Sequence, residues 1–157
     1  MLVNICIPVL KNYDGLLEMV RSFENGILKP SRYYIMDNGM NFNKDVFQEF
    51  INKITVVRPG ENVGVARSWN WFIDNVPQTR IIANDDFIIS ENCLRDFIDN
   101  LIVDKFCYPD STEQVNSFSF FYLPENVIEK VGIFDYTLSP NYGYFEDNDY
   151  HHRMLLV

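Results

Sequence analysis

The sequence is poor in basic residues and has no long apolar run, and each shortage excludes a class of protein. Thirteen lysines and arginines against 22 aspartates and glutamates give a net charge of -9. Nucleic acid or an anionic membrane is therefore not expected as the main partner, because both require a basic face. The longest apolar runs are only a few residues, so we expect no transmembrane segment and no signal peptide. A phosphate ligand would have to be met by local groups or by a metal ion.

Cysteines are few and have no pairing pattern. Cys6, Cys93 and Cys107 are far apart and odd in number, and no CxxC or Cys/His spacing typical of a zinc site occurs. We expect free, buried thiols in a reducing compartment, which favours a cytoplasmic location.

Linkers, internal repeats and low-complexity segments are also missing, which predicts a single domain over residues 1–157. The composition is 47% hydrophobic and 15% aromatic, as expected for a folded domain with a real core. This length is enough to remove roughly two-thirds of the unfolded surface from water.

The first 90 residues alternate predicted strands and helices. Short apolar runs predict buried strands, and helical spacing of apolar residues follows each run. Asn12 or Asp14 is the expected N-cap of the first helix, and Gly26 with Pro30 ends it. This alternation predicts a doubly wound, mostly parallel sheet flanked by helices, an α/β fold. The expected strands are 2–9, 33–36, 54–57 and 81–83, and the expected helices are 16–23, 46–51, 65–73 and 94–101.

The remaining chain is less regular. A further strand is expected over 87–89, and Ser90 is expected to cap the helix after it. A strand plus loop is expected over 106–116 and an aromatic strand over 117–123. Pro124 is expected at the first helical position of a short helix that Gly132 ends. A loop through Gly143 then leads to an acidic cluster that begins at Glu146.

Asn84, Asp85 and Asp86 follow a buried strand directly. An unpaired buried charge is costly, so this position favours a compensating divalent cation, and Mg²⁺ or Mn²⁺ prefers oxygen ligands. An acidic turn is the alternative, since Asn and Asp are common turn formers. In doubly wound sheets ligands bind beyond the carboxyl ends of the strands, where this cluster and three other polar loops are expected.

The order of the short motifs resembles the family 2 type of GT-A glycosyltransferases over about residues 3–153. The segments Asn62-x-Gly64-x-Ala66-x3-Asn70 and Glu146-Asp147-x-Asp149-x3-Arg153 are the most specific. The other matching pieces are Ile7-Pro8, Asp37-Asn38-Gly39, Asn84-Asp85-Asp86 and Val131-Gly132-x-Phe134-Asp135.

The resemblance implies a GT-A fold and a nucleoside-diphosphate-sugar donor held with Mn²⁺ or Mg²⁺ at a DxD-type motif. Asp86 would be the main metal ligand. Asn84 would occupy the first motif position, as in rhamnosyltransferase-like NxD variants. Asp85 would be structural or would face the donor ribose. His152 or His151 would add a third metal ligand, with two surface histidines as the alternative.

The resemblance also implies which side chain removes the acceptor proton. Asp147 would be the general base and Glu146 the second candidate, because a carboxylate within hydrogen-bond reach performs this step. The alternative is a solvated acidic start of the last helix, favoured by the helix dipole. Asp149 is expected to be a cap or scaffold residue.

The expected donor site contains Pro8, Asp37, Asn62, Gly64 and Arg67 besides the acidic motif. Asp37 would accept a hydrogen bond from the nucleotide base, although Asp-Asn-Gly also forms turns. Asn62 and Gly64 would shape the loop over the donor, where glycine permits close backbone approach. Arg67 would reach the donor phosphates or lie exposed. Trp69 is expected in the core and Trp71 partly exposed.

The expected activity is transfer of a sugar, with inversion, from a UDP- or dTDP-linked donor to a carbohydrate or other hydroxyl acceptor. The alternative is a catalytically inactive nucleotide-sugar-binding module. A nucleotidyltransferase is disfavoured, because the loop over 10–15 has one glycine and one lysine. Family members usually continue well past Arg153. The apolar residues 154–157 are expected to pack on the core, to be buried in a homodimer or to belong to a truncated helix.

Overall fold

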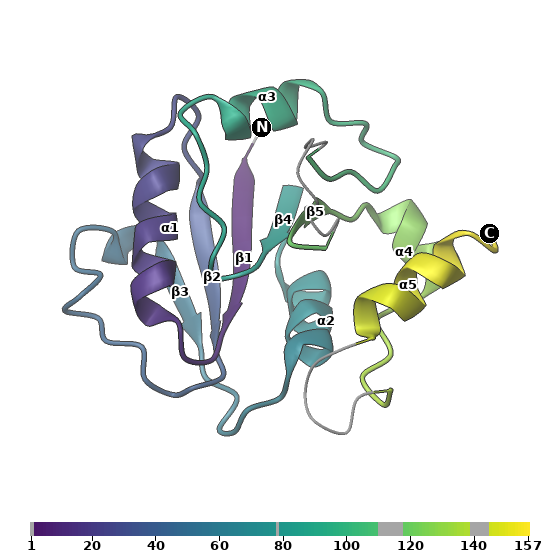
Figure 1. The fold of residues 1–157 in the computed structure, drawn as a ribbon, viewed down its shortest axis with the longest axis horizontal. Coiled ribbons are helices and arrows are strands. Elements are labelled where there is room, and N and C mark those ends of the chain that lie inside the picture. The colour runs from purple at the N-terminus through teal and green to yellow at the C-terminus, as the bar shows by residue number, and fades with distance from the viewer. Residues whose placement is uncertain (1, 78, 110–117, 139–144) are drawn as a thin grey trace.

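One five-stranded sheet forms the centre of the fold in the computed structural model (Figure 1), which describes residues 2–77, 79–109, 118–138 and 145–157. The strand order is β3-β2-β1-β4-β5. Four strands are parallel, and the edge strand β5 pairs with β4 in the antiparallel direction. This sheet confirms the predicted mostly parallel α/β fold. The strands are β1 Val3–Val9, β2 Arg32–Asp37, β3 Ile54–Val57, β4 Thr79–Ala83 and β5 Phe120–Tyr122.

Helices connect and cover the strands, and their ends follow local capping rules. The side chain of Asn12 accepts a hydrogen bond from the backbone N–H of Gly15 at 3.2 Å, which caps α1 as predicted. Gly26 and Gly132 end α1 and α4, also as predicted. The helices are α1 Tyr13–Asn25, the 3₁₀ turn η1 Ile51–Lys53, α2 Val65–Asn75, α3 Cys93–Asp99, α4 Glu125–Val131 and α5 Glu146–Met154.

Two apolar cores lie on opposite faces of the sheet. Alternate residues of a strand point to opposite faces, so Ile5 and Ile7 of β1 pack in the core that contains Phe23 of α1. Cys6 points the other way, into the core that contains Trp69 of α2 and Tyr150 of α5. The chain therefore fixes α1 on one face and α2 on the other.

Several predicted elements differ in the structure. Residues 44–50 form turns that lead into η1, and no helix spans 46–51 there. The predicted strand over 87–89 is wrong, because β5 already occupies the edge of β4. Phe87 instead stacks on Phe120 with ring centroids 4.8 Å apart, and Ile88 is 59% exposed. Asn92 precedes α3 in place of Ser90, and Pro124 is the N-cap of α4. The predictions for 110–117 and 139–143 lie outside the described residues.

The last residues are exposed. Leu155, Leu156 and Val157 are each more than 70% exposed, so the expected packing of these three on the core is wrong, and the homodimer stays a prediction.

Cys6 is buried, whereas Cys93 and Cys107 are only half-buried, and all three thiols are free. Within the described ranges no helix is both long and apolar enough to cross a bilayer. The cytoplasmic location stays a prediction.

Candidate functional site

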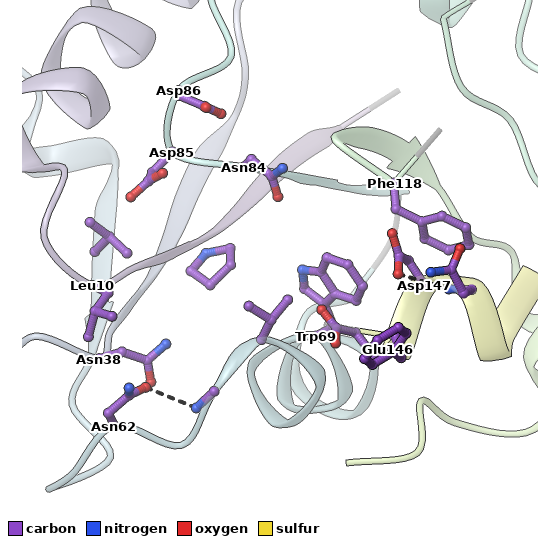
Figure 2. Close-up of a pocket in the computed structure, with 16 residues that line it drawn as sticks. Leu10, Asn38, Asn62, Trp69, Asn84, Asp85, Asp86, Phe118, Glu146 and Asp147 are labelled. Carbon is purple, nitrogen blue, oxygen red and sulfur yellow. Dashed lines mark hydrogen bonds between the residues drawn. The ribbon is translucent and has the colours of Figure 1, made fainter. Parts of the chain in front are cut away.

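A cleft of about 640 Å³ opens at the carboxyl ends of β1, β2 and β4 (Figure 2). Parallel strands bring their carboxyl ends to one edge of the sheet, and this is where doubly wound folds bind ligands. The start of α5 closes the side opposite β4. The lining residues are Pro8, Val9, Leu10, Asn38, Asn62, Gly64, Val65, Trp69, Asn84, Asp85, Asp86, Phe118, Phe145, Glu146, Asp147 and Asn148.

The cleft brings together most of the side chains predicted for the site, from four separate parts of the sequence. Three predicted residues do not line it: Asp37, Arg67 and His152. The predicted residues that do are Pro8, Asn62, Gly64, Asn84, Asp85, Asp86, Glu146 and Asp147.

Asn84 lies where β4 ends and is oriented by its neighbour Ser119. Its backbone N–H donates to the Ser119 carbonyl at 2.9 Å, and its amide nitrogen lies 3.5 Å from the Ser119 hydroxyl. This arrangement turns the amide oxygen toward the cleft (Figure 2). A carbonyl-type oxygen is an acceptor and a cation ligand.

The next two residues add two carboxylates to the same rim. Asp85 is half-buried and Asp86 is exposed. Burial and the neighbouring charge of Asp86 raise the pKa of Asp85 to about 6. The backbone carbonyl of Asp85 accepts a hydrogen bond from the Asn12 side chain at 3.1 Å, which ties this loop to the start of α1.

The donor atoms at this rim fit a hard divalent cation in kind, although the protein supplies an incomplete set. One amide oxygen and two carboxylates are the ligand types of Mg²⁺ or Mn²⁺. In the described part of the chain, no three His, Cys, Asp or Glu side chains gather closely enough to hold a metal by themselves. Any ion at this rim would therefore take further ligands from a bound phosphate or from water.

The opposite side of the cleft is the acidic first turn of α5. Phe145 precedes the helix in the left-handed region (φ 73°), and Glu146 is buried while Asp147 is half-buried. Asp147 Oδ1 accepts the backbone N–H of Asn148 at 2.8 Å. The positive end of the helix dipole lies at this turn and interacts favourably with negatively charged side chains.

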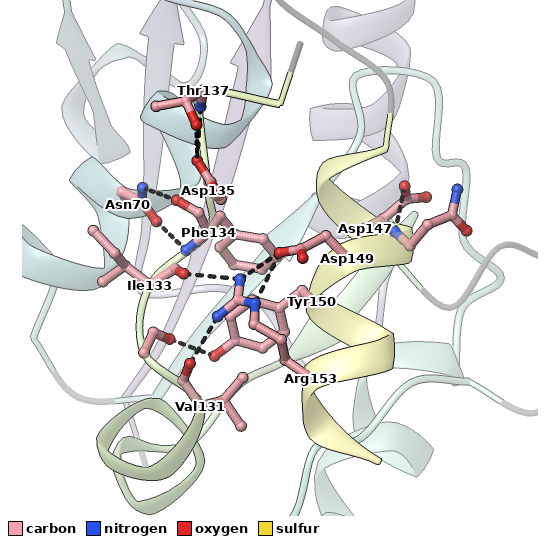
Figure 3. Close-up of polar contacts among 12 residues, drawn as sticks. Asn70, Val131, Ile133, Phe134, Asp135, Thr137, Asp147, Asp149, Tyr150 and Arg153 are labelled. Carbon is pink, nitrogen blue, oxygen red and sulfur yellow. Dashed lines mark hydrogen bonds and ion pairs between the residues drawn. The ribbon is translucent and has the colours of Figure 1, made fainter. Parts of the chain in front are cut away.

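Arg153 anchors α5 against the end of α4 (Figure 3). Its Nε and Nη2 both lie 2.8 Å from Asp149 Oδ2. Its guanidinium also donates to the carbonyls of Val131 at 2.7 Å and Ile133 at 3.0 Å. Arg153 thus joins the two last sequence motifs, and Asp149 acts as a scaffold residue in this structure.

The loop between β3 and α2 forms the lower rim. Gly64 has φ 81° and ψ 176° at the start of α2, a conformation that strongly favours glycine. Asn62 accepts the backbone N–H of Gly64 at 3.0 Å. Asn38 accepts the backbone N–H of Val63 at 3.2 Å and donates to the Ser68 hydroxyl at 3.0 Å. Asn38 therefore holds this loop to the end of β2.

Asp37 lies behind the cleft wall and is fully buried. Its two oxygens accept hydrogen bonds from the Tyr13 hydroxyl, the Arg58 guanidinium and the backbone N–H groups of Asn41 and Phe42. Burial alone would raise its pKa, but these hydrogen bonds outweigh it and hold the pKa below the usual value. In this arrangement the carboxylate orders the segment after β2.

The other two predicted residues that do not line the cleft lie on helix surfaces. The guanidinium of exposed Arg67 lies 4.5 Å from the ring centroid of Tyr136. His151 and His152 are exposed on α5. Sequence reasoning assigned no site role to Trp69, Phe118 or Phe145, whose apolar character reads simply as core or surface.

No protein-family model and no curated protein matches the sequence, whereas solved structures match its fold. TarS of S. aureus superposes with a TM-score of 0.73 at 15% identity, covering 99% of this chain and 56% of TarS residues 1–349. A mannosyltransferase from Pyrobaculum calidifontis, solved with GDP-Man and Mn²⁺, gives a TM-score of 0.68 at 10% identity over 85% of this chain and 47% of its own. TarS residues 1–349 have also been solved with UDP-GlcNAc, and that structure gives 0.61 at 14% identity over 86% and 49%.

These superpositions define the class of fold. The chain has the α/β fold of GT-A glycosyltransferases, as the motif order implied, and it spans about half the length of these neighbours. Sequence identities this low support a shared fold only, so the activity has to be argued from the cleft itself.

Proposed function

We propose that this chain is a glycosyltransferase domain that binds a nucleoside-diphosphate-sugar and transfers the sugar, with inversion, to a hydroxyl acceptor. The observation that carries the proposal is the cleft itself, with Asn84-Asp85-Asp86 on one side and Glu146-Asp147 on the other. Two acidic groups that face each other across one cleft suit the two tasks of the reaction. One assists the leaving diphosphate, and the other removes a proton from the acceptor.

The diphosphate would lie at the rim formed by Asn84, Asp85 and Asp86. The net charge of -9 and the acidic lining oppose an unaccompanied diphosphate, and bound Mn²⁺ or Mg²⁺ would supply the charge neutralisation that the leaving group needs. Asp86 and the Asn84 amide oxygen would hold that ion, with Asp85 beside them. TarS and the mannosyltransferase were solved with a nucleotide sugar, and the mannosyltransferase also with Mn²⁺. The sugar would be linked to UDP or dTDP.

The base would be Asp147. It lines the cleft as the second residue of α5, near the positive end of the helix dipole. Glu146 is the second candidate; it also lines the cleft but is only 7% exposed. The acceptor, a carbohydrate or another hydroxyl compound, would enter beside Asp147. Asn62, Gly64 and Pro8 would shape the donor side of the cleft.

The test separates binding from turnover. Purified protein is titrated with UDP, UDP-glucose, UDP-GlcNAc, dTDP-rhamnose and GDP-mannose, with Mn²⁺, with Mg²⁺ and with chelator. Release of nucleoside diphosphate is then followed with water and simple sugars as acceptors. We expect metal-dependent binding and release for at least one donor. Binding without release would establish the inactive binding module, and no binding at all would refute both readings.

The base assignment is tested by Asp147→Asn. We expect donor affinity to stay within about twofold and transfer to fall by roughly 10²- to 10⁴-fold, the usual contribution of a general base. Asp74→Asn, which changes an exposed carboxylate of α2 outside the cleft, is the matched control and keeps full activity. Unchanged transfer in Asp147→Asn would move the base to Glu146.

A further inference from the structure

The indole of Trp69 carries a buried hydrogen-bond donor that no acceptor meets. Its Nε1 atom is shielded from solvent and has no hydrogen-bond partner among the residues that the structure describes, although Trp69 lines the cleft and is 3% exposed. Buried polar groups are normally paired, so an orphaned donor calls for an explanation. In the described part of the chain the other such atom is Nε of Arg80, which belongs to a guanidinium whose other nitrogens bond Val76 and Glu125.

The ring cannot easily turn to find a partner, because aromatic side chains hold it on three sides. Phe118 stacks on it at 6.1 Å between centroids, and Phe121 and Phe134 meet it edge-on at 5.3 Å and 4.9 Å. Phe134 is itself pinned by Asn70, which donates to its carbonyl at 2.8 Å and accepts its N–H at 2.9 Å. The indole edge is thus preorganised before any ligand arrives.

The donor is aimed at the middle of the cleft. Figure 2 shows Trp69 between Asn84 on one side and Glu146 with Asp147 on the other, with its nitrogen on the ring edge that faces the cleft. An indole N–H only donates, so its partner has to be an acceptor, and a ligand oxygen in the cleft can supply one. A ligand oxygen at this point would replace the contact that the protein leaves unmade.

We propose that the Nε1–H of Trp69 donates a hydrogen bond to a ring hydroxyl of the sugar being transferred. The inference rests on the proposed function, in which the diphosphate lies at Asn84–Asp86 and the acceptor beside Asp147. The group between the two is the sugar. A neutral donor fixed by packing suits a neutral hydroxyl, whose position differs among sugars. Trp69 is therefore a residue that selects and orients the donor sugar.

The direct test uses the indole signal itself. The chain has two tryptophans, so protein labelled with ¹⁵N-tryptophan gives two indole N–H resonances, and Trp71→Phe assigns them. Trp71 is half-buried and does not line the cleft, which makes its signal the internal control. We expect a nucleotide sugar that binds, such as UDP-GlcNAc, to shift the Trp69 proton downfield. Saturating UDP should leave it in place.

A pair of variants tests the same hydrogen bond through its effect on binding affinity. Trp69→Phe keeps an aromatic ring and removes the N–H, and Trp71→Phe is the matched change outside the cleft. For Trp69→Phe we expect a loss of about 3- to 10-fold in affinity for the nucleotide sugar, the size of one hydrogen bond, and no change for UDP. Deoxy-sugar analogues of the same donor identify the hydroxyl that is bound. For the analogue that lacks this hydroxyl, wild type and Trp69→Phe should bind with equal affinity.

The outcomes are distinct. A Trp69 shift that UDP produces as fully as UDP-GlcNAc assigns the bond to the nucleotide and overturns the proposal. A nucleotide sugar that binds by calorimetry without moving the signal overturns it as well. Absence of binding by every nucleotide and nucleotide sugar removes the proposed function itself, and with it this inference. The wild-type spectrum decides even if Trp69→Phe fails to fold.

Discussion

Replacement of Asn70 by alanine tests how the two halves of the fold are joined. Asn70 is 7% exposed on α2, and its amide makes both hydrogen bonds of the Phe134 backbone, 64 residues further along the chain. Phe134 is fully buried and stacks on Tyr150 of α5 with centroids 4.1 Å apart. Alanine leaves a backbone N–H and a backbone carbonyl without a partner in the core.

The magnitude follows from those two orphaned groups. Each unpaired buried polar group costs about 1–3 kcal/mol, and a new water in the small cavity recovers part of that. We expect Asn70→Ala to lower the free energy of unfolding by about 3 kcal/mol. For a domain of this size each kcal/mol shifts the Tm by about 2–4 °C, so the Tm should fall by roughly 6–12 °C.

The assay is equilibrium unfolding in urea followed by circular dichroism, with a thermal scan beside it. Asn75→Ala is the matched control, since Asn75 lies on the same helix, is exposed and donates only to the Trp71 carbonyl at 2.9 Å. It should cost about 0.5 kcal/mol or less. If Asn70→Ala and Asn75→Ala unfold within about 0.5 kcal/mol of each other, the reasoning that this amide joins α2 to the C-terminal segment is refuted.

Two further substitutions test other joints of the molecule. Arg153→Met removes an ion pair with Asp149 and two hydrogen bonds to backbone carbonyls from a side chain that is 28% exposed, so urea unfolding should show a loss of about 2–3 kcal/mol. Arg21→Met removes only an exposed pair and should cost about 0.5 kcal/mol or less; equal effects would contradict the anchoring role. Asp37→Asn should destabilise at neutral pH, because hydrogen bonds hold the pKa of Asp37 below its usual value despite burial. A carboxylate with a lowered folded-state pKa stabilises the fold at pH values above its unfolded-state pKa. The difference in free energy of unfolding between wild type and Asp37→Asn should therefore become smaller as the pH falls below about 4. A difference that does not depend on pH would show that Asp37 is uncharged in the folded protein.

Local patterns were enough to predict the parallel part of the sheet. Hydrophobic runs and helical spacing identified β1 to β4 together with α1 and α2, because the repeat of apolar residues that distinguishes a strand from a helix is visible within a short stretch of sequence. Capping side chains such as Asn12 located helix ends for the same reason. The predicted helix over 46–51 and the predicted strand over 87–89 both have a real apolar pattern, since Phe47, Phe50 and Ile89 are buried, but these residues pack in the core from turns and loops. Phe87 packs on Phe120 of the edge strand β5. The pairing of β5 with β4 could not be predicted from the sequence.

The candidate site divides along the same line. The strand-end rule brought Gly64 and Asn84 to one edge from sequence alone, since parallel strands share their carboxyl ends, and the motif resemblance added Pro8. Which side chains face the cleft depends on long-range packing. Asp37 follows the rule in position, yet donors from three segments enclose it. Trp69 reads as core in the sequence, whereas the structure packs distant aromatic residues around its ring and gives its N–H no partner among the described residues.

The sequence by itself therefore determined the order of the elements and the acidic motif that follows β4. Only the tertiary structure decided that α5 crosses to the far side of the same cleft and sets Asp147 opposite Asn84. That placement depends on Arg153 and on the stacking of Phe134 with Tyr150. The physical reason is that the periodicity of strands and helices lies in neighbouring residues. The closing of the cleft depends instead on contacts between residues far apart in the chain, which must offset the entropy cost of bringing them together.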